Sequence, residues 1–341
     1  MIRPSARLAG AAVLAVLFIP MSKATAQTQV PSAPTQVPAA PATTPSLQAP
    51  AAPAPTAAPV FPKPDPTNFT ATSPTKQEID DFLQASWGYD ENRMWQVQAI
   101  LKTPADGVSR VVVLVGDKTG KGRISAIQFY ALPDGKHIIV GNDIIPFGEH
   151  PFAADRAILQ QRADGPYRGA ASKDLELVEF ADFECPHCKD AQANMDKLVA
   201  DFPKARIVFQ NYPLTRIHPE AKLAAEYGVC VTKMGGSSAF FQFAPAVFEG
   251  QDGLATKDGA TLTLNSAVTK AGLDPLKVQA CASTPAVSQE VDSSVQLARD
   301  LNIQETPTLM INGRQIPLGN IPYDMLKKII QYQAKLDGVA E

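Results

Sequence analysis

The sequence contains few of the residues from which metal sites and nucleic-acid surfaces are built. Among 341 residues there are only four cysteines and four histidines. No second Cys-x-x-Cys pair and no paired histidines are present, so a tetrahedral zinc site would lack its four ligands. The net charge is −3 and runs of lysine or arginine are absent, which argues against nucleic acid and anionic membrane surfaces as partners. We therefore expect no metal, no cofactor and no nucleic-acid partner.

The N-terminal apolar run is too short for a comfortable membrane span. It extends from Leu8 to Phe18, follows Arg3 and Arg7, and is followed by Ala24-Thr25-Ala26. This pattern predicts a secretory signal over residues 1–26 that is cleaved after Ala26. An uncleaved signal anchor is the alternative, and only then would the protein be tethered to a membrane. Export predicts a periplasmic protein in an oxidising compartment, where disulfides form.

Charge is almost absent from the segment that follows. Residues 27–66 are mostly Ala, Pro, Thr, Gln and Ser, with twelve prolines from Pro31 to Pro66. Such a segment has little apolar surface to bury and forms an extended spacer. We interpret residues 27–74 as a disordered linker.

The sequence does contain one closely spaced thiol pair, Cys185-Pro186-His187-Cys188. The apolar stretch 175–180 before it is typical of a strand, and residues 190–199 after it are typical of a helix. A strand that leads into Cys-x-x-Cys at a helix N-terminus is the thioredoxin-like redox arrangement. There, unpaired backbone N–H groups and the helix dipole favour a thiolate.

We assign Cys185 as the nucleophile and Cys188 as the resolving thiol. Pro186 removes one N–H group and stiffens the turn. A partly cationic His187 would favour the anion on Cys185; the alternative is an exposed imidazole without a role. Haem attachment is excluded because Lys189, and not a histidine, follows the second cysteine. A purely structural disulfide is disfavoured because so short a loop restrains the unfolded chain little.

Turn signals divide the rest of the chain into two folded regions. Residues 75–164 begin with a capping box at Thr75 and Glu78 and are predicted to form a small α+β domain that serves packing or association. Its strand-like runs are 95–101, 110–115, 124–130 and 137–140, and a short helix is predicted over 155–162. Residues 165–341 show the order βαβ, helices, ββα, with a hairpin turn at Asn312-Gly313. They are predicted to form an α/β thioredoxin-like fold with a helical insert at about 213–301.

Residues 183–188, followed about 120 residues later by Thr306-Pro307-Thr308, resemble the DsbA-like thiol-disulfide oxidoreductases. The resemblance covers roughly residues 165–336 and implies a periplasmic enzyme that exchanges disulfides with unfolded or newly exported proteins. It also implies that Pro307 is cis and faces the active disulfide, and that Thr306 presents its backbone to the substrate chain. The alternative for Pro307 is an ordinary edge-strand or turn proline.

Glu179 lies in the apolar strand six positions before Cys185. A lone carboxylate is costly to bury there unless it has a partner or a function. The DsbA-like resemblance implies a buried acid at this position that moves protons to and from the resolving thiol. The alternative is that Glu179 points to the solvent face of an edge strand.

Two further groups lie in the predicted insert. Cys230 and Cys281 are expected to pair, because an exported chain with an even number of cysteines tends to form disulfides. Such a structural disulfide would contribute roughly 3–4 kcal/mol in the chain-entropy model, and a second redox relay is the alternative. The phenylalanines at 240, 241, 243 and 248 form either the core of the insert or a peptide-binding groove beside the dithiol.

Residues 130–141 resemble the end of the dimerisation domain of DsbC/DsbG-type isomerases, the alternative being a generic Asp-Gly hairpin. Taken together, the thiol pair, the two resemblances and the predicted export lead to three candidate functions. The leading one is an exported oxidase that forms disulfides in reduced client proteins and is reoxidised by an unidentified redox partner. The second is a homodimeric isomerase or reductase that acts on misoxidised exported proteins. The third is a chaperone-like binding module with a secondary dithiol.

Overall fold

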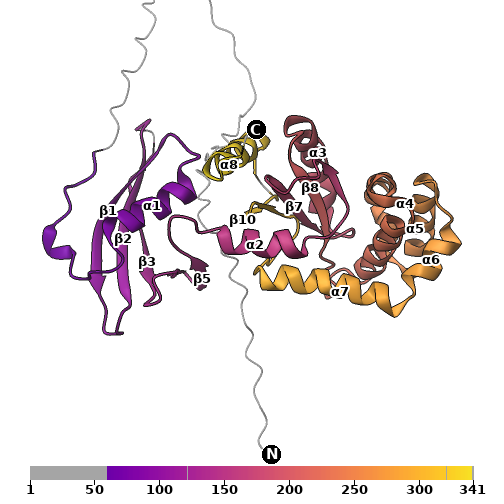
Figure 1. Cartoon of the computed structure of the whole chain (residues 1–341), viewed down its shortest axis with the longest axis horizontal. Helices are drawn as coiled ribbons and strands as arrows, with labels where there is room; N and C mark the ends of the chain where they lie inside the picture. Colours follow the sequence, from indigo (N-terminus) through magenta and orange to yellow (C-terminus); the bar gives the residue numbers. More distant parts are fainter. Residues whose placement is uncertain (1–59, 121, 320, 340–341) are drawn as a thin grey trace, which may run out of the picture.

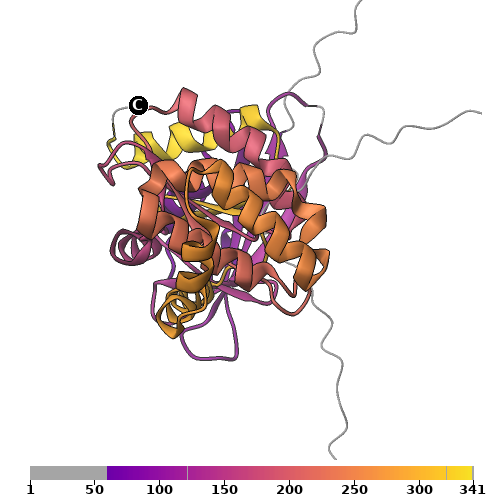
Figure 2. The ribbon, with the colours of Figure 1, turned by 90° about the vertical axis from the view of Figure 1, so that its right-hand side faces the viewer.

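The computed structural model describes residues 60–120, 122–319 and 321–339 and contains two five-stranded sheets (Figure 1). The predicted signal segment 1–26 and most of the predicted linker lie outside the described residues. Along the long axis of the molecule, an N-terminal domain is followed by a central sheet and then by a group of helices (Figure 1). Figure 2 looks onto that group of helices from its outer side.

The N-terminal domain packs one helix, α1 (Lys76–Trp87), on an antiparallel sheet of order β1-β2-β3-β4-β5. The strands are β1 (Arg93–Lys102), β2 (Ser109–Asp117), β3 (Ser125–Ala131), β4 (His137–Val140) and β5 (Asp143–Pro146). The capping box at Thr75 and Glu78 is confirmed. The four predicted strands are present with boundaries within two residues, whereas β5 was not predicted because it has only four residues.

The folded part begins before residue 75. A short 3-10 helix, η1 (Pro66–Asn68), leads to Phe69, which bridges in parallel to Ile100 of β1. The backbone N–H of Ala71 donates to the Ile100 carbonyl at 3.0 Å, and both Phe69 and Ala71 pack against the core of the domain. The C-terminal end of the segment interpreted as linker, 27–74, is therefore part of the N-terminal domain.

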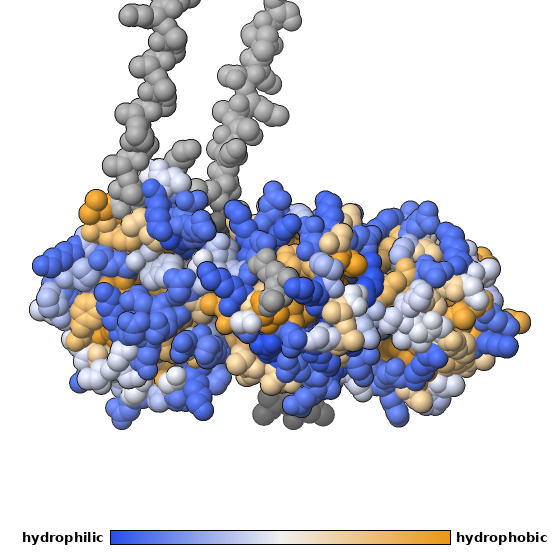
Figure 3. Space-filling model, turned by 45° about the horizontal axis from the view of Figure 1, so that its top comes forward, coloured by the Kyte–Doolittle hydropathy of each residue, from blue (hydrophilic) through white to orange (hydrophobic). Residues whose placement is uncertain are grey.

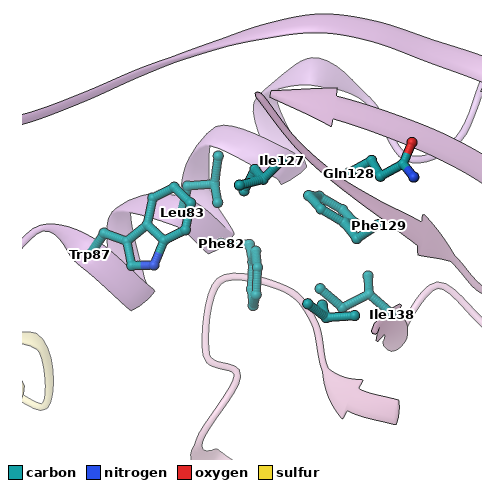
Figure 4. Close-up of a pocket in the computed structure, with 8 residues that line it drawn as sticks. Phe82, Leu83, Trp87, Ile127, Gln128, Phe129 and Ile138 are labelled. Carbon is teal, nitrogen blue, oxygen red and sulfur yellow. The ribbon is translucent and has the colours of Figure 1, made fainter. Parts of the chain in front are cut away.

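A pocket of about 220 Å³ lies between α1 and the sheet of this domain. Figure 4 shows Phe82, Leu83 and Trp87 of α1 opposite side chains of β3 and β4 such as Phe129 and Ile138. None of the eight lining residues has a titratable or nucleophilic side chain. This pocket therefore offers no group for acid–base or nucleophilic chemistry.

The second sheet has the order β10-β9-β7-β8-β6. Its strands are β6 (Tyr167–Gly169), β7 (Glu176–Ala181), β8 (Arg206–Asn211), β9 (Thr308–Ile311) and β10 (Arg314–Pro317). The central strand β7 runs parallel to β8 and antiparallel to β9. The three-residue edge strand β6 was not predicted. The hairpin turn at Asn312-Gly313 is confirmed, with both residues at positive φ between β9 and β10.

Helices cover both faces of this sheet. On one face lie α3 (Pro186–Asp201) and α8 (Tyr323–Leu336), and on the other lie α2 (Ala153–Arg162) and α7 (Pro285–Asp300) (Figure 1). Successive side chains of a strand point to opposite faces. Leu177 of β7 packs with α3 and α8, whereas Val178 and Phe180 pack with α2 and α7. Glu179 therefore faces the α3 side.

The helical insert extends from β8 to β9. Its elements are α4 (Ala221–Glu249), the 3-10 helix η2 (Gln251–Ala255), α5 (Lys257–Lys270), α6 (Pro275–Ala282) and α7. Gly236, at φ 69° and ψ −172°, interrupts α4. A disulfide joins Cys230 of α4 to Cys281 of α6. Phe240, Phe243 and Phe248 are at most 3% exposed and form core of the insert.

Arg314 of β10 connects the two sheets. The residue is 4% exposed, and its guanidinium donates to the backbone carbonyls of Ala85 and Ser86 at the end of α1 and to Gln333 of α8. The N-terminal domain is thus anchored to the second sheet by hydrogen bonds that a buried cation donates to the end of α1. The face drawn in Figure 3 is mainly hydrophilic, with apolar residues in small scattered groups. In the described ranges, no helix is long and apolar enough to cross a membrane.

Candidate active site

The thiol pair lies where β7 leads into α3. Cys185 is the N-cap residue of α3, and Cys188 lies in the first turn of that helix. The carbonyl of Cys185 accepts the N–H groups of Cys188 and Lys189 at 3.1 and 3.3 Å, as expected of a helix start. Both cysteines are free thiols; Cys185 is 5% exposed and Cys188 is fully buried.

The sulfur of Cys185 is surrounded by hydrogen-bond donors. A hydrogen bond from the Cys188 thiol is the main cause that lowers the pKa of Cys185 to about 5, and burial opposes this shift. The Thr306 side chain and the backbone N–H groups of Cys188 and His187 lower the pKa further. Cys185 is therefore a thiolate at neutral pH, the form in which sulfur is nucleophilic.

The second thiol has the opposite tendency. Burial is the main cause that raises the pKa of Cys188 well above its usual value, and its hydrogen bond to Cys185 adds to the shift. The backbone N–H of Asp182 donates to Cys188 Sγ at 3.4 Å. Cys188 therefore stays protonated until Cys185 is engaged in a bond, which matches a resolving thiol.

Pro186 and His187, the two residues between the cysteines, are both exposed. Pro186 occupies the first position of α3, where a missing N–H group costs no hydrogen bond. His187 acts on Cys185 through its backbone N–H, which lowers the pKa of the thiol. The predicted effect of a cationic His187 imidazole on Cys185 stays a prediction.

The loop before β9 closes the site on its other side. The Thr306–Pro307 peptide bond is cis, and Cys185 Sγ lies 3.5 Å from the Thr306 carbonyl oxygen, to which it donates only when it is protonated. Thr306 is 8% exposed, and its side chain lies close enough to Cys185 to lower the pKa of that thiol. Pro307 precedes β9, which lies between β10 and β7, so it is not an edge-strand proline.

Glu179 is 2% exposed, on the central strand of the sheet. The alternative of a solvent-facing carboxylate on an edge strand is therefore wrong. Burial is the main cause that raises the pKa of Glu179 to about 7, and a hydrogen bond from Gln192 opposes the shift. The charge of Glu179 in turn raises the pKa of Cys188, so the two groups are electrostatically coupled. A carboxyl group with this pKa can both give and take a proton near neutral pH.

Sequence reasoning did not identify the polar residues that hold the thiol loop. Asp182 has a fully buried carboxylate that accepts hydrogen bonds from the backbone N–H groups of Glu184 and Leu214 and from His218. Gln251 of η2 donates from Nε2 to the carbonyls of Phe183 and Cys185 at 2.8 and 3.0 Å. An acid between a buried strand and Cys185 was a usable signal for Asp182. The sequence carries no comparable signal for Gln251, which is 66 residues from Cys185.

Within the part of the chain that the structure describes, no group of three or more His, Cys, Asp or Glu residues is arranged to hold a metal ion. The site consists instead of an ionised thiol, a buried thiol and a nearby carboxyl group. An ionised thiol beside a second thiol is the arrangement that thiol-disulfide exchange uses.

Comparison with known proteins agrees with this geometry. The family model described as Thioredoxin matches residues 161–332, about half of the chain. The chain belongs to the thioredoxin family. The matched residues of this thioredoxin-family domain include the whole second sheet, the thiol pair and the helical insert.

The curated relatives are much longer proteins, of which only a part matches this chain. The Na(+)/H(+) antiporter NhaA 3 of Salinispora tropica is 32% identical over 151 residues, which are 43% of this chain and 22% of that protein. The Na(+)/H(+) antiporter NhaA 1 of Salinispora arenicola is 28% identical over 148 residues. The chain thus spans about a fifth of the length of the curated relatives it matches.

Among solved structures, a thioredoxin-like oxidoreductase from Silicibacter pomeroyi is 25% identical with a TM-score of 0.45. That match covers 53% of this chain and 98% of the other. ScsC of Proteus mirabilis in a transitional conformation is 23% identical with a TM-score of 0.45, covering 55% and 78% of the two chains.

Proposed function

We propose that the protein is an exported thiol-disulfide oxidoreductase that forms disulfides in reduced client proteins. One observation carries this proposal: the pKa of Cys185 is lowered to about 5 while that of Cys188 is raised. A stable thiolate favours the reduced form of the pair over its disulfide. A pair whose reduced form is favoured accepts electrons readily and so acts as an oxidant.

The reaction begins from the Cys185–Cys188 disulfide. A client thiolate attacks Cys185 Sγ, the bond between the two enzyme sulfurs breaks, and Cys188 leaves and takes up a proton. Glu179, with a pKa of about 7, is placed to supply that proton. The second client thiolate then attacks the client sulfur of the mixed disulfide and releases Cys185 as a thiolate. The client loses two electrons and the enzyme gains them.

Export and location are part of the same proposal. The pattern of residues 1–26 supports secretion to the periplasm, where the clients would be newly exported proteins with reduced thiols. Each turnover leaves the enzyme reduced, so an electron acceptor must restore its disulfide. That redox partner is inferred from the balance of electrons alone.

A homodimeric isomerase is the second candidate, favoured by the separate N-terminal domain. The outer strand β5 pairs with β4 and forms an edge of the sheet, and its Ile144 is 60% exposed. An exposed edge strand with an apolar side chain is a surface on which a second chain can pair. An isomerase would work from the reduced state, with Cys185 attacking a wrong disulfide of the client. The mass of the protein in solution and its resting redox state separate this function from the oxidase.

The proposal is tested with the purified full chain and a reduced, unfolded client whose free thiols are counted over time. The disulfide form of the enzyme is expected to consume two client thiols for each disulfide formed. Cys185→Ser and Cys188→Ser should each abolish this reaction, because neither variant can form the Cys185–Cys188 disulfide that the client thiolate attacks. Suppression of client aggregation that survives in Cys185→Ser, without thiol consumption by the wild type, would support a chaperone-like binding module instead.

A further inference from the structure

Gln192 lies one helical turn after Cys188 on α3, and its side-chain amide contacts the groups used in the resolving step. Its Nε2 donates to Glu179 Oε1 at 3.0 Å and to the Cys188 carbonyl oxygen at 3.1 Å. Side chains on a helix extend back over the preceding turn, which brings position 192 over position 188. One amide group therefore joins the buried acid to the backbone of the resolving cysteine.

The orientation of this amide follows from its neighbours. A carboxylate and a backbone carbonyl are both acceptors, and only the NH₂ end of a glutamine has two donors. Both donors are then used within the site. A leucine at this position would fill a similar volume and donate to neither group.

Few charges surround the Glu179 carboxylate. Arg168 of β6 and Asp196 of α3 act on it with opposite signs, and they are paired with each other at 2.6 Å. Cys188 is the third titratable group coupled to it. Gln192 differs from all three because it is a neutral direct donor, half-buried at the boundary between Glu179 and solvent.

We propose that Gln192 is a positioning residue that holds the Glu179 carboxylate in place for proton exchange with Cys188 and thereby sets the pH range of the resolving step. This inference rests on the proposed function, specifically on proton exchange between Glu179 and Cys188. A donor to the carboxylate favours its ionised form. Removal of the donor should keep Glu179 protonated to higher pH. The Glu179 carboxylate, which is the base that deprotonates Cys188, should then form only at higher pH.

The test uses the reduced full chain and oxidised glutathione. Cys185 attacks the reagent and forms a mixed disulfide with glutathione. Cys188 then loses its proton to Glu179, attacks Cys185 Sγ and releases glutathione thiolate. The rate of that release is measured from quenched samples across pH, and its midpoint reports the titration of Glu179.

Gln192→Leu is expected to move this midpoint upward by about one pH unit, the scale of one hydrogen bond to a charged group. Gln192→Lys places a cation beside the carboxylate and is expected to move the midpoint downward. Asn194→Leu, on the same helix, is the matched control and should leave the midpoint unchanged. In a Glu179→Gln background, Gln192→Leu should have no further effect on the pH profile.

The outcomes distinguish the role of Gln192 from proton exchange between Glu179 and Cys188. A midpoint that Glu179→Gln abolishes but that neither Gln192 variant moves would overturn the role of Gln192 alone. A wild-type profile without this midpoint, or one unchanged by Glu179→Gln, would overturn proton exchange through Glu179 as well. A merely structural glutamine would lower the unfolding midpoint of both variants and leave the pH midpoint where it is. Opposite shifts in the leucine and lysine variants support the proposal.

Discussion

Asp182 Oδ2 accepts a hydrogen bond from His218 Nδ1 at 2.8 Å, and this contact joins the end of β7 to the loop that leads into the helical insert. The same carboxylate also accepts the backbone N–H groups of Glu184 and Leu214 at 2.8 and 2.7 Å. Three donors therefore converge on one buried acid directly before Cys185. The position of the thiol loop depends on this acid.

Replacement of Asp182 by alanine should destabilise the protein. The change leaves buried donors without an acceptor, each of which costs about 1–3 kcal/mol. We expect the free energy of unfolding to fall by about 3 kcal/mol in urea titrations. Asp182→Asn retains one acceptor oxygen and should lose less. Equal stability of Asp182→Ala and the wild type would show that the network does not hold the loop.

The thiolate of Cys185 should depend on its donors. Cys188→Ala removes the donor that lowers the pKa of Cys185 most and should raise that pKa from about 5 by roughly one unit or more. Thr306→Val removes a weaker donor and should raise the pKa by less. Thiolate absorbance against pH measures both values. A Cys185 pKa that stays near 5 in both variants would place the stabilising charge elsewhere.

Glu179 should make the disulfide form less stable as the pH rises. Its folded pKa of about 7 lies above the usual value of 4.5 for a glutamate, so the folded state binds more protons than the unfolded state between these values. The contribution of Glu179 to stability is therefore fully present below about pH 4.5, falls by about 3 kcal/mol on the way to pH 7 and then levels off. Denaturant titrations of the disulfide form measure this slope without interference from titrating thiols. Glu179→Gln should remove the slope, and a wild type without it would contradict a raised pKa.

The Cys230–Cys281 disulfide should contribute stability without entering the redox reaction. It closes a loop with a sequence separation of 51, for which the chain-entropy model gives about 4 kcal/mol. The double variant Cys230→Ser/Cys281→Ser is expected to unfold more easily by roughly that amount, while the potential of the Cys185–Cys188 pair stays unchanged. A loss of client oxidation in a still folded double variant would instead indicate a redox relay.

Local signals in the sequence were sufficient for the elements around the thiols. The strand before Cys185, the helix after Cys188 and the Asn312-Gly313 turn each have a pattern within a few residues. The edge strands β5 and β6 have four and three residues, too few to show a period, and they exist through pairing with their neighbours.

Long-range polar contacts could not be predicted in the same way. Gln251 reaches the thiol loop only because η2 folds back on that loop. No pattern around Gln251 in the sequence indicates this contact. Gln192 was within reach of a prediction, since it follows Cys188 by four residues on one helix and Glu179 needed a buried partner.

The most direct test of the central claim is the reduction potential of the Cys185–Cys188 pair, measured in glutathione buffers on the full chain. Stabilisation of the Cys185 thiolate predicts an oxidising couple, with a reduction potential of about −120 mV, at the oxidising end of the known range. The elution mass of the same sample reports the oligomer, and a dimer with a clearly more reducing couple would favour the isomerase. A potential below about −300 mV would mark a structural bridge and contradict the assignment of this pair as a disulfide donor.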